Sequence, residues 1–582
     1  LPHPAAKSRA AGTNLMQNAQ GITNIWLSST LFDKFLKMKT FSRDQLAPKN
    51  GLQRLILALI SLLPLMISSE SISASTPKNI ALIAGPITGH PKDAHEYEKT
   101  ITLIKHCLES SPNAPDLEIS AHYGGWPIEP EVLNRADTIL LVSDGSDQDE
   151  SMHPFYRDDR FAILKQQMDR GCGIMLLHWS TFHPARHHDD ITEWIGGYFD
   201  YETGPGPRKW FSKIQTWEDT VQLATPNHPI LKGVKPFKLK DEYYYNIKFR
   251  KSDPGLLPVL KVTPPDQTQP DTVGWAVERA NGSRGFGFTG GHFHDSWWIP
   301  DFRRMLLNAI VWTTGHDVPE LGIESNLSPR YRTMILTGNN HPAHDWRKTT
   351  AALIHAVELD PRNLAHATES PEKWLLENDP SDYDLLIMNY CNWKSSGWNR
   401  EAQERLRNYV EAGGGLAVIH FGNGAFHPSL PEAKNSDWPG YRDLVRRVWD
   451  HHGDSAHDPY GDFQVIISQV KHPITRGLKN FGTTDELYFQ QAGKDPVQAL
   501  AYAFSKVTRK PEPMAWAYRV GKGRVFQTLL GHSNKSIHQA ANLIQRGATW
   551  AAHQKPLTFA PPRTIAQNAI FRNGSQWRPD QP

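Results

Sequence analysis

The sequence predicts two tandem α/β domains, each with a mostly parallel sheet flanked by helices. Short apolar strands alternate with helical stretches, which is the pattern of a parallel sheet covered on both faces. The same landmark residues occur twice, in the same order, in the two halves of the 582-residue chain. The period is far too long for a solenoid, so we interpret it as a domain duplication.

The register of the duplication is nearly constant. Four pairs of equivalent residues are separated by 420 − 178 = 242, 472 − 228 = 244, 486 − 242 = 244 and 532 − 292 = 240 positions, which correspond to His178/His420, His228/His472, Glu242/Glu486 and His292/His532. Chance alignment does not account for four offsets that agree within four residues.

The elements follow in order in each half. A strand ends in glycine, and a loop with two histidines follows it. A second strand comes after an aspartate, and a third strand follows a glycine turn. An Asp-Glu-aromatic cluster, a tryptophan-bearing strand, a last strand ending in histidine and a helix complete each half. The paired ranges are 79–85 and 331–338, 137–142 and 384–388, 171–178 and 413–420, 241–244 and 485–488, 274–276 and 515–517, 285–292 and 524–532, with closing helices ending at Trp312 and Trp550.

An apolar run at residues 55–67 follows Lys49 and Arg54 and precedes the small residues 73–75, a pattern typical of a secretory signal peptide. We therefore expect a periplasmic or secreted protein with no stable membrane span after processing. We expect residues 1–75 to comprise a stretch assigned upstream of the true start (an over-called start) plus the signal peptide. A first domain (76–318), a linker (319–330), a second domain (331–554) and a C-terminal tail (555–582) are expected to follow.

Composition and missing motifs exclude several classes of function. The 63 Lys+Arg and 61 Asp+Glu residues give a net charge of +2, so the chain has no overall electrostatic footprint for nucleic acid. Three cysteines without a CxxC pair argue against a disulfide framework and a thiolate zinc site. Because there is no GxGxxG with a downstream acid and no Walker sequence, no nucleotide cofactor is expected.

Several motifs of the second half, from Tyr331 to Gln554, resemble the ThuA-like, or trehalose utilisation, family. They are Gly-Gly-Gly-Leu-Ala-Val-Ile-His, His-Pro-Ile-Thr-Arg-Gly-Leu, Asp-Glu-Leu-Tyr and Gly-Lys-Gly-Arg-Val-Phe…Leu-Gly-His. The first half, from Asn79 to His316, matches more loosely. The resemblance implies two flavodoxin-like domains related to class I glutamine amidotransferases and a link to disaccharides, including oxidised (keto) sugars. Amidotransferases present a cysteine nucleophile where this chain has histidine, so glutamine hydrolysis through a thioester is not expected.

Ligands of open α/β sheets bind beyond the carboxyl ends of the strands, where the repeated histidines and acids are expected to converge. Such residues can transfer protons or bind a divalent metal. The catalytic candidates are His178, His292, Asp241, Glu242, His420, His532, Asp485 and Glu486, and the substrate-binding candidates are His90, His95, His341, His344 and Asn423. The candidate metal ligands are His452 and His457, in a loop near His451 whose first-half counterpart has no histidine.

The leading hypothesis is an exported enzyme that hydrolyses, eliminates or isomerises a small disaccharide or glycoside by histidine and carboxylate acid-base chemistry. Two alternatives stay open: a non-catalytic carbohydrate-binding or scaffold protein, and a metal-dependent sugar-modifying enzyme. A strand-end histidine can also be purely structural, capping loop backbone. The first half is either a second active copy or a degenerate copy, and the sequence does not specify the oligomeric state.

Overall fold

The computed structural model describes residues 76–86, 89–204, 209–251, 254–431 and 435–556. The predicted signal peptide and most of the predicted tail lie outside the described residues. Within the described ranges, every helix falls short of the length and apolarity that a membrane crossing requires.

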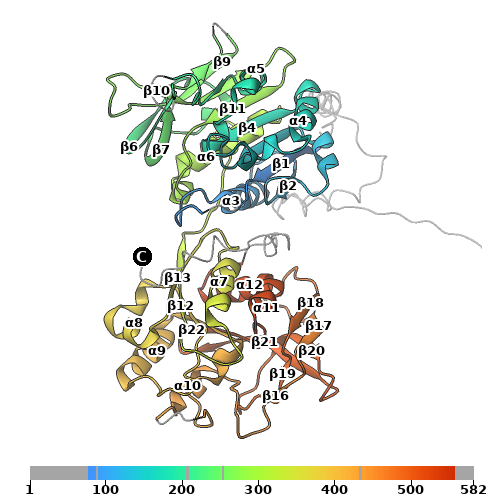
Figure 1. The fold of residues 1–582 in the computed structure, drawn as a ribbon, viewed down its shortest axis with the longest axis vertical. Helices are drawn as coiled ribbons and strands as arrows, with labels where there is room; N and C mark the ends of the chain where they lie inside the picture. The colour runs from blue at the N-terminus through green and yellow to red at the C-terminus, as the bar shows by residue number, and fades with distance from the viewer. Residues whose placement is uncertain (1–75, 87–88, 205–208, 252–253, 432–434, 557–582) are drawn as a thin grey trace, which may run out of the picture. The chain divides into compact units, whose positions relative to one another are not determined.

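The first domain contains a nine-stranded sheet in the order β2-β1-β3-β4-β11-β10-β9-β6-β7 (Figure 1). The strands from β2 to β11 are parallel, and the remaining four pair antiparallel. Their bounds are β1 Lys78–Ala84, β2 Leu117–His122, β3 Thr138–Val142, β4 Gly173–Leu177, β6 Lys213–Leu223, β7 Phe237–Tyr245, β9 Leu256–Val262, β10 Asp271–Glu278 and β11 Arg284–Phe288.

The second domain repeats this topology, in the order β13-β12-β14-β15-β22-β21-β20-β17-β18. Its strands are β12 Tyr331–Leu336, β13 Asn363–Thr368, β14 Leu385–Met388, β15 Gly415–Ile419, β17 Gly461–Ile467, β18 Phe481–Asp485, β20 Ala499–Phe504, β21 Pro511–Val520 and β22 Gly523–Thr528. Two α/β domains with a parallel centre are therefore confirmed. The antiparallel half of each sheet is more extensive than the sequence pattern indicates.

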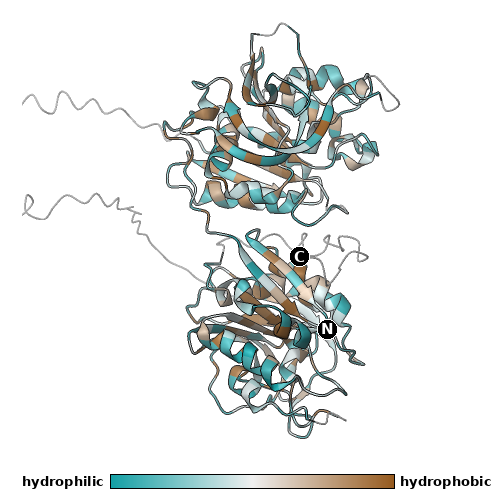
Figure 2. Ribbon diagram, turned by 90° about the vertical axis from the view of Figure 1, so that its left-hand side faces the viewer, coloured by the Kyte–Doolittle hydropathy of each residue, from teal (hydrophilic) through white to brown (hydrophobic). Residues whose placement is uncertain are grey.

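Helices cover the parallel strands on both faces, which is why β4 and β15 are apolar and buried at every residue. Figure 2 shows brown, hydrophobic strands inside the domains and helices that are teal on their outer sides. The helices are α3 Tyr97–Glu109, α4 Arg160–Asp169, α5 His188–Ile195, α6 Pro300–Thr313, α7 Trp346–Val357, α8 Pro371–Glu377, α9 Arg400–Ala412, α10 Pro439–Leu444, α11 Asn534–Gln539 and α12 Ala541–Ala551.

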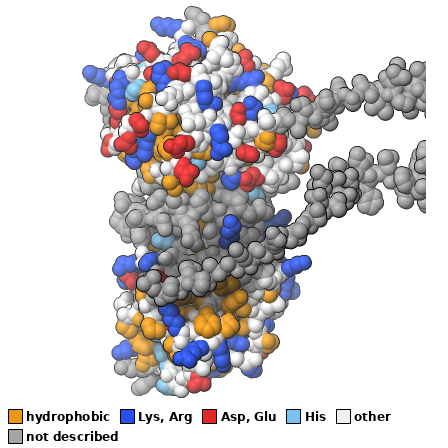
Figure 3. Space-filling model, turned by 90° about the vertical axis from the view of Figure 1, so that its right-hand side faces the viewer, with side chains coloured by type: hydrophobic (Ala, Val, Ile, Leu, Met, Phe, Trp, Pro, Cys, Tyr) orange, Lys and Arg blue, Asp and Glu red, His pale blue; other side chains and the backbone are white. Residues whose placement is uncertain are grey.

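The tryptophans Trp275 and Trp516, on β10 and β21, are fully buried core residues, as their place within strands predicts. Two short ribbons lie outside the main sheets, β5 (Gly197–Tyr198) with β8 (Lys248–Phe249) and β16 (Ala456–His457) with β19 (Tyr488–Phe489). On the face drawn in Figure 3, basic and acidic side chains are interspersed in the upper domain, whereas the lower domain shows mainly hydrophobic and basic side chains.

Candidate functional site

Three histidines and one glutamate converge beyond the ends of the parallel strands in each domain. Within each group, one ligand atom per residue lies within 4.8 Å of the others. The first-domain group is His95, His178, Glu242 and His292, and the second-domain group is His344, His420, Glu486 and His532. We call these the first and second tetrads. The sequence predicted this convergence because the repeated histidines and acids follow the carboxyl ends of strands.

A sharp turn presents the elbow histidine of each tetrad. His178 and His420 directly follow β4 and β15 and begin short 3₁₀ helices, η5 (His178–Thr181) and η10 (His420–Gly424). Their φ angles of 52° and 42° lie in the left-handed region, which non-glycine residues seldom adopt. Such strain concentrates at functional sites, because the surrounding structure must hold it.

Hydrogen bonds fix the tautomer of both elbow histidines. Nδ1 of His178 lies 2.7 Å from the carbonyl oxygen of Thr289, and Nδ1 of His420 lies 2.6 Å from that of Leu529. A carbonyl only accepts, so Nδ1 is the protonated nitrogen and Nε2 presents a lone pair to the tetrad. Metal-binding histidines typically have their second ring nitrogen bonded in this way.

A buried aspartate organises the other two residues in each tetrad. The Asp485 carboxylate accepts the backbone N–H groups of Gly531 at 2.8 Å, His532 at 3.1 Å and Glu486 at 2.8 Å. It thereby ties the end of β18 to the loop after β22. Gly531 has a φ of 126°, which explains the glycine before this histidine.

The first domain has the same arrangement. The Asp241 carboxylate accepts N–H groups from Gly291, His292 and Glu242 at 2.6, 3.0 and 2.9 Å. Burial raises the pKa of Asp485 and that of Asp241, the latter to about 7. The carboxylates of both aspartates that the sequence predicts as catalytic are therefore hydrogen-bonded to backbone N–H groups.

The second tetrad has the properties of a ligand set for a cation. Nδ1 of His344, Nε2 of His420 and Nδ1 of His532 are buried and have no hydrogen-bond partner. Oε2 of Glu486 lies 3.7 Å from Nε2 of His420 and 3.1 Å from Nδ1 of His532. Buried polar atoms are nearly always paired, so three buried imidazole nitrogens that share one carboxylate and have no other partner fit a metal ion.

Electrostatics support the same interpretation. Burial and the neighbouring imidazoles, His420 first, lower the pKa of His344 to about 2, so its ring is neutral near pH 7. Burial favours a raised pKa for Glu486, but the imidazoles of His420 and His532 hold it below its ordinary value. His344 therefore presents a neutral imidazole and Glu486 an ionised carboxylate, the forms in which these side chains bind metals.

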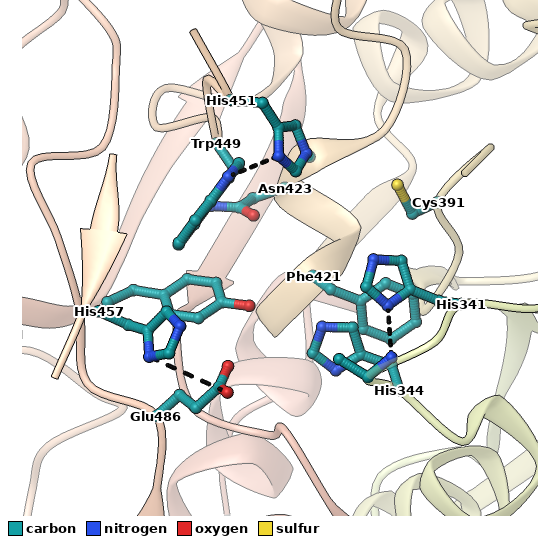
Figure 4. A pocket seen from close by; sticks show the side chains of 12 residues that line it. His341, His344, Cys391, Phe421, Asn423, Trp449, His451, His457 and Glu486 are labelled. Carbon is teal, nitrogen blue, oxygen red and sulfur yellow. Dashed lines mark hydrogen bonds and ion pairs between the residues drawn. The ribbon is translucent and has the colours of Figure 1, made fainter. Parts of the chain in front are cut away.

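A pocket of about 140 Å³ adjoins the second tetrad. In Figure 4, Trp449 and His451 lie on one side, with His341 and His344 across from them. The indole Nε1–H of Trp449 donates to Nδ1 of His451 at 3.2 Å. The pocket is lined by His341, Ala343, His344, Cys391, Phe421, Asn423, Gly424, Trp449, His451, His457, Glu486 and Tyr488.

The remaining predicted residues differ in whether they line the pocket, contact a tetrad residue or are exposed to solvent. His341 and Asn423 line the pocket, and burial lowers the pKa of His341 to about 4. His90 lies 3.0 Å from Asp144 and stacks on His95. Of the two metal ligands predicted from sequence, His452 is exposed and bonds through its backbone to Asp450.

His457 lines the pocket, and its Nδ1 lies 4.0 Å from Oε1 of Glu486. Among the described residues, neither His452 nor His457 belongs to a tetrad. Sequence reasoning missed the pocket residues Phe421, Trp449 and Tyr488. Tyr488 is the only one with a usable signal, because it closes the repeated Asp-Glu-x-Tyr pattern.

The fold and the tetrads together define a duplicated α/β protein with an imidazole and carboxylate site at the strand ends of each domain. The family model ThuA, described as trehalose utilisation, matches residues 87–313 and 332–551. The chain belongs to the ThuA family and contains two tandem copies of its domain.

Similar solved structures include a putative ThuA-like protein from Parabacteroides merdae, with 22% identity, 40% of this chain and 93% of that chain covered, and a TM-score of 0.34. A second putative ThuA-like protein, from Bacteroides uniformis, has 17% identity, 40% and 95% coverage, and a TM-score of 0.29. A β-galactosidase from Rahnella sp. R3 has 13% identity, 42% and 33% coverage, and a TM-score of 0.28. No curated protein sequence matches the chain.

Proposed function

We propose that the second domain is a metal-dependent enzyme that hydrolyses, eliminates or isomerises a small carbohydrate. The observation that carries this proposal is the set of three buried imidazole nitrogens gathered around the Glu486 carboxylate, which is the nearest polar group to two of them. His344, His420, His532 and Glu486 would bind a first-row divalent ion such as zinc, for which histidine and glutamate are common ligands.

The pocket supports a sugar as the substrate. Carbohydrates present apolar ring faces and many hydroxyl groups, and this pocket combines the aromatic rings of Phe421, Trp449 and Tyr488 with several polar side chains. Membership of a family described as trehalose utilisation favours the same substrate class.

The bound ion and the side chains of the protein would have different roles in the reaction. A bound ion would act as a Lewis acid on a carbonyl or hydroxyl oxygen of the sugar. His457 would transfer a proton at its Nε2 atom, because its Nδ1 atom is engaged with the carbonyl oxygen of Asp458 at 2.7 Å. Its position beside Glu486 on the pocket wall supports this role.

We also propose that the chain is exported. The support is the apolar run at residues 55–67 with its preceding basic residues and following small residues. Expression in a Gram-negative host, followed by fractionation and N-terminal sequencing, tests this point. Recovery of the uncleaved chain in the cytoplasm contradicts it.

The experiment for the enzymatic proposal is a turnover assay of the Zn²⁺-loaded full chain on disaccharides and their keto derivatives. Turnover should be lost on chelation and in the near-isosteric variant Glu486→Gln, whereas His452→Ala, an exposed matched control, should keep it. Turnover that survives chelation and Glu486→Gln overturns the proposal. Saturable sugar binding without turnover also overturns it and favours a carbohydrate-binding protein.

A further inference from the structure

We infer that the first domain holds a second, coordinatively closed metal site, in which the hydroxyl of Tyr244 joins His95, His178, His292 and Glu242 as a ligand. This site lies outside the function proposed above, which concerns the other domain. It stands on the contacts of the first tetrad alone.

The first observation is crowding around one lone pair. Nε2 of His178 lies 3.2 Å from Nδ1 of His292 and 2.8 Å from the hydroxyl of Tyr244. Since the Nδ1 proton of His178 is directed to a backbone carbonyl, Nε2 has a single in-plane lone pair to offer. It cannot accept well from both neighbours, whereas a cation between them would be bound by all three atoms.

The carboxylate completes the same group. Oε1 of Glu242 lies 3.8 Å from Nε2 of His178, 3.5 Å from Nδ1 of His292 and 3.4 Å from the Tyr244 hydroxyl. These separations are too long for strong hydrogen bonds, but atoms that surround one ion stand about this far apart when each is roughly 2 Å from it. The carboxylate also supplies the negative charge that a divalent ion requires.

His95 is oriented as a metal-binding histidine would be. Its Nδ1 lies 2.6 Å from the hydroxyl of Tyr97, which donates to Oδ1 of Asp144 at 2.6 Å. A phenol whose proton is given to a carboxylate accepts from the imidazole, so Nδ1 is protonated and Nε2 presents a lone pair. Such relays to a carboxylate fix the orientation of ligating imidazoles.

The tyrosine distinguishes the two domains. Tyr488 is the equivalent residue in the second domain, where its ring centroid lies 4.2 Å from that of His420. Nε2 of His420 nevertheless has no hydrogen-bond partner, whereas Nε2 of His178 has the Tyr244 hydroxyl. The Tyr244 hydroxyl therefore fills a coordination position in the first domain, whereas the equivalent position in the second domain is open to the pocket. Closed ligand sets are typical of structural metals, and open ones of catalytic metals.

Zn²⁺ content per chain tests the inference directly. The dialysed full chain should hold two Zn²⁺ ions, and Glu486→Gln should retain one, which the additional substitution Glu242→Gln removes. Circular dichroism and thermal melts confirm that each variant is folded. A Glu486→Gln chain without bound Zn²⁺ overturns the inference. That result leaves the proposed function intact if wild-type turnover still requires the ion.

The role of Tyr244 needs a separate readout, because a merely structural tyrosine would not alter the metal spectrum. Co²⁺ bound to the Glu486→Gln chain should change its visible spectrum in Tyr244→Phe, and Zn²⁺ should bind there roughly tenfold more weakly. Tyr488→Phe, the matched control, should leave that spectrum unchanged. If the Co²⁺ spectrum is identical with and without the Tyr244 hydroxyl, the tyrosine is not a ligand. That result overturns the inference of a closed site.

Discussion

The carboxylate of Asp485 holds the backbone N–H of His532 at 3.1 Å while also holding the N–H of Glu486 at 2.8 Å. One buried side chain thus sets the separation between two members of the second tetrad. The same bonds recur around Asp241 in the first domain.

Asp485→Asn should therefore weaken Zn²⁺ binding in the second domain by roughly 10- to 100-fold, the usual effect of losing an outer-shell partner. The amide has one acceptor oxygen instead of two, so the N–H of Gly531, which bonds to the second oxygen, loses its acceptor, and the loop that carries His532 is held less firmly. Titration calorimetry measures the affinity. Asp241→Asn is the matched control, since it should leave the second site unchanged. Wild-type affinity in a folded Asp485→Asn chain would contradict the positioning role.

Removal of metal should lower thermal stability. An ion that binds only the folded state contributes about 2.7 kcal/mol at a free concentration one hundred times its Kd. Calorimetric scans with Zn²⁺ and with excess chelator should therefore differ, and Glu242→Gln combined with Glu486→Gln should abolish the difference. A chelator effect of equal size in that double variant would show that the stabilising ion binds elsewhere.

Trp449→Ala should weaken sugar binding roughly tenfold, which corresponds to about 1.4 kcal/mol. The indole is part of the pocket wall, and its loss removes both apolar contact and the hydrogen bond that orients His451. KM should rise more than kcat falls. Phe504→Ala, on an exposed aromatic residue, serves as the control. Unchanged KM in Trp449→Ala would place the sugar elsewhere.

A buried ion pair should make the second domain sensitive to acid. Arg362 donates to Asp360 through Nε at 2.8 Å and through a terminal nitrogen at 2.6 Å. Burial favours a raised pKa for Asp360, but Arg362 outweighs it and holds that pKa below its ordinary value. The resulting stability is present above the unfolded pKa, near about 3.9, and is lost as the pH falls through the folded value.

Arg362→Met should therefore lower the free energy of unfolding by about 3–5 kcal/mol at pH 7, because it leaves a buried carboxylate unpaired. The difference from wild type should shrink as the pH falls, first where the unpaired, buried Asp360 of the variant takes up a proton, above the unfolded pKa, and then where Asp360 of the wild type does so, below it. Urea unfolding at several pH values measures this. If the difference in the free energy of unfolding between wild type and variant were independent of pH, lost packing rather than lost charge would account for it.

Much of the fold could be predicted from the sequence, because repeated apolar strands and strand-end histidines are local patterns. The sequence could also place His420 and His532 near one another, since parallel strands end at one edge of a sheet. It could not separate Asp485 from Glu486, because neighbouring residues on a strand point to opposite sides and the register is set by tertiary pairing.

The loop residues were less predictable for a related reason. His452 and His457 lie near each other in sequence and are both exposed, but only His457, which lies on β16, lines the pocket. Trp449 carries no local pattern that distinguishes a pocket wall from a core position. The extent of the antiparallel half was missed because the direction in which two strands pair is set by tertiary contacts and not by a local sequence pattern.

Each tetrad draws its four ligands from four separate stretches of chain. An unfolded chain offers no compact chelating pair among them, so the ion cannot act as a nucleus for folding. Under the proposals above, a metal ion would therefore bind late, to a domain that has already folded. The metal that each site acquired would then depend on the ions available in the compartment where the chain completes its folding.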